Sequence, residues 1–203
     1  MGIRDWLQPR LLDWAMRQMN ELRPETVGLA EGRVLELGFG TGLNLGFYGP
    51  AVKALVGVDP QAAEGFAPTA ARMAEVHFPV ECVCEPADQP LPLAAGEFDS
   101  AVSTWTLCTI PDPVRALVEV RRVLRPGARL YFVEHGRAEA EGTARWQDRF
   151  NPCWCRLADG CNMNRRIDRI VEAAGFRLES LERFRADGPG VLAQMYRGVA
   201  VPA

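Results

Sequence analysis

Short apolar runs alternate with amphipathic stretches along most of the chain, from about residue 33 onward. Such runs are typical of strands buried on both faces, and apolar residues three or four positions apart are typical of helices. The predicted strands are 33–37, 54–58, 80–84, 98–103 and 129–133, and the predicted helices are 113–124 and 167–174. This alternation predicts an α/β fold, a doubly wound and mostly parallel sheet with helices on both faces.

The two ends of the chain depart from this alternation. Residues Arg10 to Leu22 place apolar side chains at helical spacing, which predicts an amphipathic N-terminal helix that serves as packing surface or as a lid over a ligand. Residues 176–184 and 194–201 have the composition of strands, and the turn-rich segment between them is too short for a helical crossover. We therefore expect an antiparallel pair that closes one edge of the sheet.

Composition excludes several classes of protein. With 203 residues, 48% of them hydrophobic and 24% charged, the chain has the composition of one folded domain with elaborations. The net charge of −3 lacks the basic excess of a protein that binds nucleic acid. No signal peptide and no membrane span are predicted, so we expect a cytoplasmic protein whose six cysteines are reduced.

The first predicted strand leads into a glycine-rich loop. Glycines at positions 38, 40 and 42 allow a tight turn and a close approach of a ligand to the backbone, and a short helix is expected to open at Gly42. The spacing is G-x-G-x-G and not the G-x-G-x-x-G of nicotinamide and flavin binders. Asp59 ends the next strand, where a carboxylate can accept hydrogen bonds from ribose hydroxyls. A tight turn and a helix cap are the structural alternatives, but the two features together predict an adenosine-containing ligand.

These motifs, with Leu124–Gly127 before the fifth strand, resemble the class I S-adenosylmethionine-dependent methyltransferases. The resemblance covers about residues 33–200 and implies S-adenosylmethionine as cofactor and a seven-stranded Rossmann-like sheet with an antiparallel last strand. In that family the glycine loop passes under the methionine part, the acid after strand two holds the ribose, and the pair after strand three contacts the adenine. The cofactor-binding residues implied here are Glu36, Gly38, Gly40, Thr41, Gly42, Asn44, Asp59, Pro60, Ala87, Asp88, Thr104 and Trp105.

The carboxyl half resembles one group within this family more closely. The irregular residues that carry this resemblance are Trp105–Cys108, Phe132–His135, Trp146–Gln147, Asn151–Pro152 and Asp159–Asn162. They are similar to the alkyl thiol methyltransferases of the methyltransferase-like group, which implies a thiol acceptor. Those relatives begin with a hydrophobic membrane anchor, which is not expected here.

Methyl transfer from a sulfonium is an in-line displacement, so the protein mainly aligns the acceptor and excludes water. His135, at the end of the fifth strand, is the candidate for proton acceptor, with a core role as the alternative. Glu134 would point the opposite way on a regular strand. Asp159 and Cys161 form a second candidate cluster, or a structural turn. Cys153, Cys155 and Cys161 lack the C-x-x-C spacing of zinc sites, so no metal site is predicted and three unlinked thiols near an apolar pocket are favoured.

The sequence thus predicts one methyltransferase domain over residues 1–203 acting on a small molecule, thiol sulfur being the favoured acceptor. Residues 1–30 form a helical extension, 31–135 the cofactor-binding half, and 136–203 the substrate-side segment and closing strands. The alternatives are an arsenite or an oxygen-, nitrogen- or carbon-directed methyltransferase, a nicotinamide-dependent oxidoreductase, and a module that binds the cofactor without catalysis. Neither a nucleic-acid partner nor a membrane partner is expected, and the oligomeric state is left open.

Overall fold

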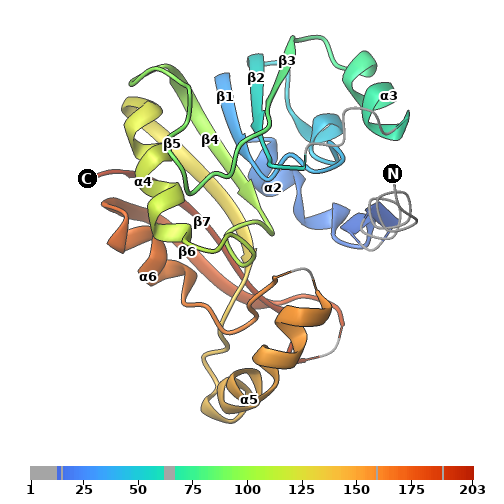
Figure 1. Cartoon of the computed structure of the whole chain (residues 1–203), viewed down its shortest axis with the longest axis vertical. Helices are drawn as coiled ribbons and strands as arrows, with labels where there is room; N and C mark the ends of the chain where they lie inside the picture. The colour runs from blue at the N-terminus through green and yellow to red at the C-terminus, as the bar shows by residue number, and fades with distance from the viewer. Residues whose placement is uncertain (1–12, 15, 62–66, 159, 189) are drawn as a thin grey trace.

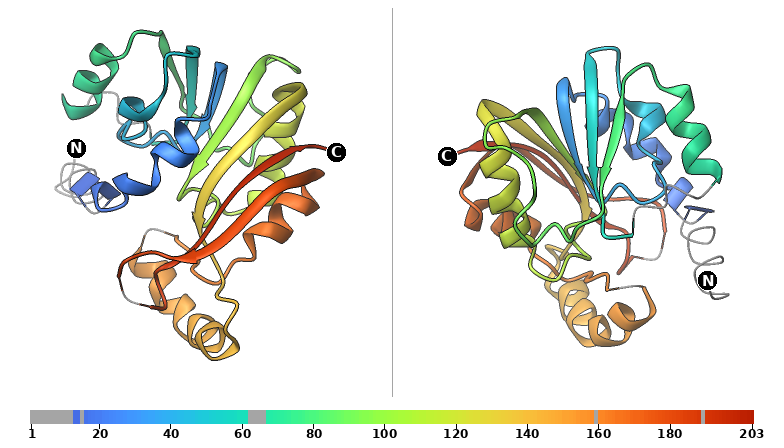
Figure 2. Two further views of the ribbon diagram at one scale, coloured as in Figure 1. Left: turned by 180° about the vertical axis from the view of Figure 1, so that it is seen from behind. Right: turned by 45° about the horizontal axis from the view of Figure 1, so that its top comes forward.

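Seven strands form one sheet in the order β3-β2-β1-β4-β5-β7-β6 in the computed structural model, which describes residues 13–14, 16–61, 67–158, 160–188 and 190–203. The strands are β1 (Gly32–Leu37), β2 (Val52–Val58), β3 (Val80–Val83), β4 (Phe98–Thr104), β5 (Leu124–His135), β6 (Phe176–Arg185) and β7 (Gln194–Pro202). Strands β1 to β5 are parallel, and β7 is antiparallel to both β5 and β6. The predicted doubly wound sheet with an antiparallel edge pair is confirmed, and Figure 2 shows the pair extending the sheet beyond β5.

Helices cover both faces of this sheet (Figure 1). On one face lie α4 (Pro113–Val123) and α6 (Ile167–Ala173), whose apolar residues join the larger core. On the other face lie α2 (Pro24–Val27), the 3₁₀ helix η2 (Leu45–Phe47) and α3 (Ala67–Glu75), packed around a second core. Helix α5 (Glu141–Leu157) lies below the sheet in Figure 1, beyond the carboxyl end of β5.

Alternating side chains of the strands feed these two cores. On β1, Leu35 and Leu37 pack under α4, whereas Val34 packs against the opposite layer. Glu36 therefore faces the same side as Val34, where it lies buried beneath the loop that follows the strand. The period of two along the strand thus decides that a carboxylate lies beneath the glycine loop.

Local signals set the limits of α4 as the sequence predicts. Asp112 accepts a hydrogen bond from the Arg115 backbone N–H at 3.0 Å, and Pro113 occupies the first helical position. The helix ends at Val123 because Leu124 already starts β5.

Three segments of the structure differ from the prediction. Of the predicted N-terminal helix over residues 10–22, positions 10–12 and 15 lie outside the described residues. Positions 13, 14, 16 and 17 are helical, and a 3₁₀ helix η1 (Asn20–Leu22) follows. The short helix expected at Gly42 is the 3₁₀ helix η2, which begins three residues later. Helix α5 was not predicted, because Pro152 lies inside it. None of the described helices is long and apolar enough to cross a bilayer.

Candidate active site

The glycine loop between β1 and η2 has one open side. Gly38, Gly40 and Gly42 all have positive φ angles, of 72°, 53° and 73°, which L-residues rarely adopt. A Cβ at Gly38 would lie 2.0 Å from the Thr106 Oγ1 atom, so this position is closed against the loop after β4. A Cβ at Gly40 would meet no heavy atom nearer than 4.0 Å. The backbone at Gly40 is therefore accessible to a ligand.

A buried carboxylate holds this loop from below. Glu36 accepts hydrogen bonds from Asn44 Nδ2 at 2.9 Å and from the Tyr48 hydroxyl at 2.7 Å. The Asn44 amide also donates to Thr104 Oγ1 on β4 at 3.0 Å. Burial raises the pKa of Glu36 to about 7, although the hydrogen bonds from Tyr48 and Asn44 act in the opposite direction. The network joins β1, β4 and the residues after the glycine loop.

Arg23 connects the N-terminal segment to this network. Its guanidinium is buried, donates to Asn44 Oδ1, and lies 4.9 Å from the centroid of the Trp105 ring. Burial lowers the pKa of Arg23 to about 10, so the group stays charged at neutral pH. A charged group beside the negative face of an indole is a favourable cation–π contact.

Asp13 makes a second connection from the N-terminal segment, to the glycine loop itself. Its carboxylate accepts from Thr41 Oγ1 at 2.8 Å and from Arg72 Nη1 at 2.7 Å. Arg72 Nη1 also donates to the Thr41 carbonyl at 2.7 Å. Hydrogen bonds from Arg72, Thr41 and Arg17 lower the pKa of Asp13 despite its burial. The N-terminal segment is thus bound directly to the loop that the sequence assigns to the cofactor.

Asp59 lies at the end of β2, facing the same loop. One carboxylate oxygen accepts the Gly40 backbone N–H at 2.9 Å, and the other accepts that of Gln61 at 2.8 Å. The structural alternative from the sequence, a turn residue, is therefore realised. Each oxygen retains a second lone pair, so these bonds do not prevent the carboxylate from accepting further hydrogen bonds.

Trp105, directly after β4, has a strained backbone. Its φ angle is 51°, the one positive value for a non-glycine residue within the described ranges. Its backbone N–H donates to Val133 at 2.9 Å, which holds the strand end against β5. Its indole Nε1 is buried without a hydrogen-bond partner. Strain of about 1–3 kcal/mol concentrated at a strand end is a feature of functional sites.

Three side chains that are far apart in the sequence meet at the carboxyl edge of the sheet. We name Cys108, His135 and Cys161 the thiol–imidazole cluster. Cys161 Sγ lies 3.7 Å from Cys108 Sγ and 3.9 Å from His135 Nδ1. Hydrogen bonding from Cys108 lowers the pKa of the Cys161 thiol, while the same bond and burial raise the pKa of Cys108. The titrations of the two thiols are therefore linked to each other.

A buried carboxylate supports the cluster. Glu134 is fully buried and accepts from Ser103 Oγ at 2.7 Å and from the backbone N–H of Cys108 at 3.3 Å. Burial raises the pKa of Glu134, and these hydrogen bonds oppose the shift. That Glu134 and His135 face opposite ways stays a prediction, since both side chains reach Cys108, Glu134 at its backbone N–H and His135 at its sulfur. Glu134 holds the loop after β4, and His135 meets the thiols.

The similarity of the chain to known proteins agrees with this arrangement. A family model described as a methyltransferase domain matches residues 35–132. The thiol S-methyltransferase TMT1B of Homo sapiens is 38% identical over 170 residues, which cover 80% of this chain and 69% of that protein. The chain belongs to the class I S-adenosylmethionine-dependent methyltransferases. The expectation of a methyltransferase enzyme is confirmed.

Other similar proteins extend this result. The thiol S-methyltransferase TMT1A of Homo sapiens is 34% identical over 155 residues, 75% of this methyltransferase and 63% of that protein. The methyltransferase thus spans about two thirds of the length of these curated relatives. Among solved structures, the [4+2]-cyclase SpnF has a TM-score of 0.69 at 23% identity, covering 92% of this chain and 80% of its own. A possible histamine N-methyltransferase from Thermotoga maritima has a TM-score of 0.68 at 21% identity, covering 99% and 98%. These structures support the fold.

The cofactor of this family fits the residues present at the glycine loop. A Cβ at Gly40 would occupy the open side, so the loop leaves room for a ligand. Asp59 lies at the carboxyl edge of the sheet, where open α/β sheets bind nucleotides. The unpartnered indole N–H of Trp105 lies at the end of β4, which pairs with β1 along the same edge.

The remaining predicted site residues belong either to the cofactor side or to the acceptor side. Asp88 and Ala87 are buried, and Asp88 accepts the Asp112 backbone N–H at 3.3 Å. Their contact with adenine stays a prediction, as does the assignment of Pro60 to the cofactor-binding residues. Asp159 lies outside the described residues. Cys161, which the sequence grouped with Asp159 as a candidate cluster, belongs to the thiol–imidazole cluster.

Cys108 was not among the predicted site residues, although it belongs to the Trp105–Cys108 motif. The prediction also grouped Cys161 with Cys153, which is exposed, and Cys155, which is half-buried. The spacing of the cysteines could not show that Cys108 and Cys161 meet, because tertiary contacts bring together two segments that are 53 residues apart. Asn162 donates to the Cys108 carbonyl from its backbone at 2.8 Å and from its side chain at 3.3 Å.

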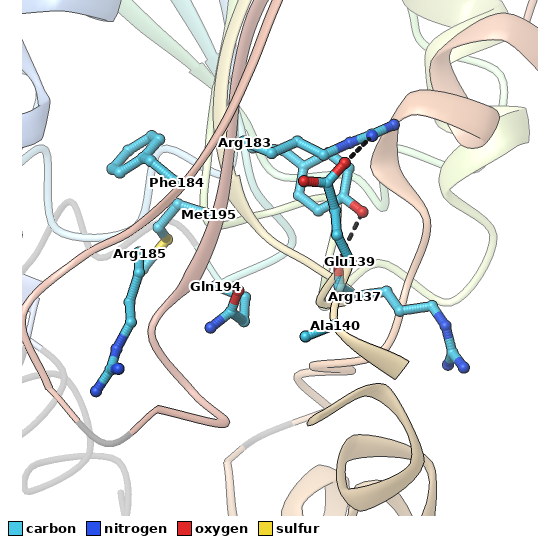
Figure 3. Close-up of a pocket in the computed structure, with 9 residues that line it drawn as sticks. Arg137, Glu139, Ala140, Arg183, Phe184, Arg185, Gln194 and Met195 are labelled. Carbon is cyan, nitrogen blue, oxygen red and sulfur yellow. Dashed lines mark hydrogen bonds and ion pairs between the residues drawn. The ribbon is translucent and has the colours of Figure 1, made fainter. Parts of the chain in front are cut away.

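A cavity of about 170 Å³ lies elsewhere, between β6, β7 and residues 137–140 (Figure 3). Arg183 donates to Glu139 at 2.5 Å across it, and the Tyr196 hydroxyl donates to the Arg137 carbonyl at 2.7 Å. None of its lining residues belongs to the glycine loop or to the thiol–imidazole cluster. We therefore do not assign the cofactor or the acceptor to this cavity.

Proposed function

We propose that this methyltransferase transfers the methyl group of S-adenosylmethionine to the sulfur of a small thiol. The observation that carries the proposal is the 38% identity to a thiol S-methyltransferase over most of the chain. The geometry agrees, because the thiol–imidazole cluster lies at the carboxyl edge of the sheet, where α/β enzymes gather their reacting groups.

The cofactor would be held by the glycine loop and by the strand ends around it. In this proposal residues 38–42 lie under the methionine part of the cofactor. The Asp59 carboxylate accepts hydrogen bonds from the ribose hydroxyls. The Asp88 side chain and the Ala87 backbone contact the adenine. The Glu36 network keeps the loop in place from below. When bound, the cofactor supplies a methyl group on a positively charged sulfonium sulfur.

Because that methyl group is already activated, the protein has two tasks: to align the acceptor and to exclude water. The N-terminal segment can serve the second task, since Arg23 and Asp13 bind it to the glycine loop. A free thiol has a pKa near 8.5, so a fraction is thiolate at neutral pH. A thiol acceptor therefore depends less on deprotonation by a protein base than an alcohol acceptor does. In this proposal His135, whose Nδ1 lies 3.9 Å from Cys161 Sγ, is the candidate proton acceptor.

The test is the release of S-adenosylhomocysteine with a panel of thiols, phenols, amines and arsenite. We expect turnover with thiols and none above background with phenols and amines. Turnover with arsenite alone, or with an oxygen or nitrogen acceptor alone, would contradict the thiol proposal. Calorimetric titration of S-adenosylmethionine and NADH runs in parallel. Binding of the first without turnover on any acceptor would indicate a non-catalytic module, and binding of NADH an oxidoreductase.

A further inference from the structure

We infer that Cys108, His135 and Cys161 form a three-ligand site for a thiophilic divalent cation, zinc being the expected ion, with a fourth position open to the acceptor. The three ligand atoms, two sulfurs and one ring nitrogen, all lie within 4.8 Å of one another. Cys108 and Cys161 are buried and His135 is half-buried. The cluster is therefore closed on the sulfur side and open on the imidazole side.

The distances suit tetrahedral zinc. Two sulfurs that are each about 2.3 Å from a tetrahedral ion lie about 3.8 Å apart, and a sulfur and a nitrogen lie about 3.5 Å apart. The observed distances are 3.7 Å between the sulfurs and 3.9 Å between Cys161 Sγ and His135 Nδ1. The third pair, Cys108 Sγ and the His135 ring nitrogen, lies within 4.8 Å, so the imidazole must move toward Cys108 by up to about 1.3 Å to complete a tetrahedral set.

Neighbouring groups hold the ligands in this geometry, as the outer contacts of metal sites do. The Cys108 backbone N–H donates to Glu134, and its carbonyl accepts two hydrogen bonds from Asn162. Asn162 in turn accepts from Asn151 on α5 at 2.9 Å. His135 lies on β5, where antiparallel pairing with Met195 fixes the backbone. Each ligand is therefore positioned by an element other than its own loop.

The donor set also indicates the kind of site. Soft thiolates with one imidazole select zinc over calcium or magnesium, and three protein ligands with an open position are typical of catalytic zinc. This set differs from the three cysteines at positions 153, 155 and 161, which lack the C-x-x-C spacing of zinc sites. Cys108, His135 and Cys161 come from separate segments, so that spacing rule does not apply to them. Only one of those three cysteines is a member.

The role of the open position rests on the proposed function. An acceptor thiol that coordinates there loses its proton to solvent, because a zinc-bound thiol is deprotonated. Its sulfur then attacks the methyl carbon as the bond from that carbon to the sulfonium breaks. The products are the methyl thioether, S-adenosylhomocysteine and one proton. In this arrangement His135 is a ligand of the cation and does not remove the proton itself.

The test is the metal content of the reduced full-length chain, produced without a histidine tag, after loading with zinc and gel filtration. We expect about one zinc per chain, and cobalt(II) in its place should give thiolate-to-cobalt charge-transfer absorption that shifts when a small thiol is added. Cys108→Ser, Cys161→Ser and His135→Gln should each weaken zinc binding by more than about a hundredfold. The matched control is Cys153→Ser, which changes an exposed cysteine outside the cluster and should bind zinc as wild type does.

Circular dichroism and calorimetry with S-adenosylmethionine establish that each variant is folded. Less than a tenth of an equivalent of zinc in the reduced wild type, or an equal loss in the Cys153→Ser control, would overturn the inference. Thiol methylation at the wild-type rate by zinc-free enzyme would overturn the role of the open position. Stoichiometric zinc without thiol methylation would support the site and count against the proposed function alone.

Discussion

The cofactor end and the acceptor end of this methyltransferase are built in different ways. The cofactor end is one continuous stretch, residues 36–48. It contains the three glycines, and within it the Asn44 amide and the Tyr48 hydroxyl both donate to the Glu36 carboxylate. At the acceptor end, Cys108, His135 and Cys161 come from three separate segments and meet through tertiary contacts. The first region can be recognised from sequence spacing, and the second cannot. The two regions should also respond differently to substitution.

The largest effect is expected at the acceptor end. His135→Ala should lower kcat/KM for a thiol by about 10²–10⁴-fold, since the imidazole is lost either as a proton acceptor or as a ligand. Affinity for S-adenosylmethionine should stay unchanged, because His135 makes no contact with the glycine loop among the hydrogen bonds of the described residues. Kinetics and calorimetry measure the two quantities. The exposed His77→Ala variant is the control, and an equal loss of cofactor affinity in His135→Ala would show that the two ends are not separate.

The next effect is a pH dependence of stability at the cofactor end. The pKa of Glu36 is raised by burial to about 7 from an ordinary value of 4.5. The folded chain therefore binds more protons than the unfolded chain between these pH values. The contribution of Glu36 is fully present below about pH 4.5 and is lost as the pH rises through about 7. The difference in pKa corresponds to about 3 kcal/mol of unfolding free energy.

Glu36→Gln should remove this slope, as measured by denaturant unfolding between pH 4.5 and 7. The nearby charges Arg23 and Asp59 stay in place in the variant, so the comparison isolates the carboxyl group. Glu75→Gln, which changes an exposed glutamate, should keep the slope of the wild type. A variant at position 36 with an unchanged slope would refute the assignment.

A smaller effect is expected from Asp59. Asp59→Ala removes charge-assisted hydrogen bonds that are worth about 1.5–3 kcal/mol each, so cofactor affinity should fall at least about tenfold. Asp59→Asn separates two roles, because the amide oxygen can still accept the Gly40 N–H but the carboxylate for the ribose diol is lost. We expect both variants to bind weakly by calorimetry. Wild-type affinity in Asp59→Asn would reduce the role of Asp59 to support of the loop.

The smallest effect lies outside both ends. Asp112→Ala removes the N-cap of α4 and should lower the free energy of unfolding by about 1 kcal/mol, with unchanged methyl transfer. Asp112→Asn should keep most of the stability, because an amide oxygen also accepts the Arg115 N–H. Denaturant unfolding of the three proteins measures the difference. Altered cofactor binding in Asp112→Asn would mean that the contact of Asp112 with Asp88 reaches the site.

The sequence by itself determined the sheet, most strand limits, α4 with its cap, and the glycine loop with Asp59. These features depend on interactions between residues close in the chain: side-chain alternation along a strand, hydrogen bonding at a helix end, and the backbone freedom of glycine. It did not reveal α5, where Pro152 interrupts the local pattern but Gln147 is fully buried and bonds to Gly136 and Val191. Contacts with distant segments outweigh local preference there.

Only the tertiary structure decided which chemical groups meet. Arg23 of the N-terminal segment donates to Asn44, 21 residues away in the chain. The Cys108 and Cys161 sulfurs are in contact although 53 residues separate them. Parallel strands place their carboxyl ends at one edge, so the sequence could assign His135 to that edge. Which thiols stand beside its ring depends on how the loops after β4 and α5 pack, through hydrogen bonds such as those of Asn162 to the Cys108 carbonyl. Such contacts carry no spacing rule, because they form only after the sheet has brought the loops together.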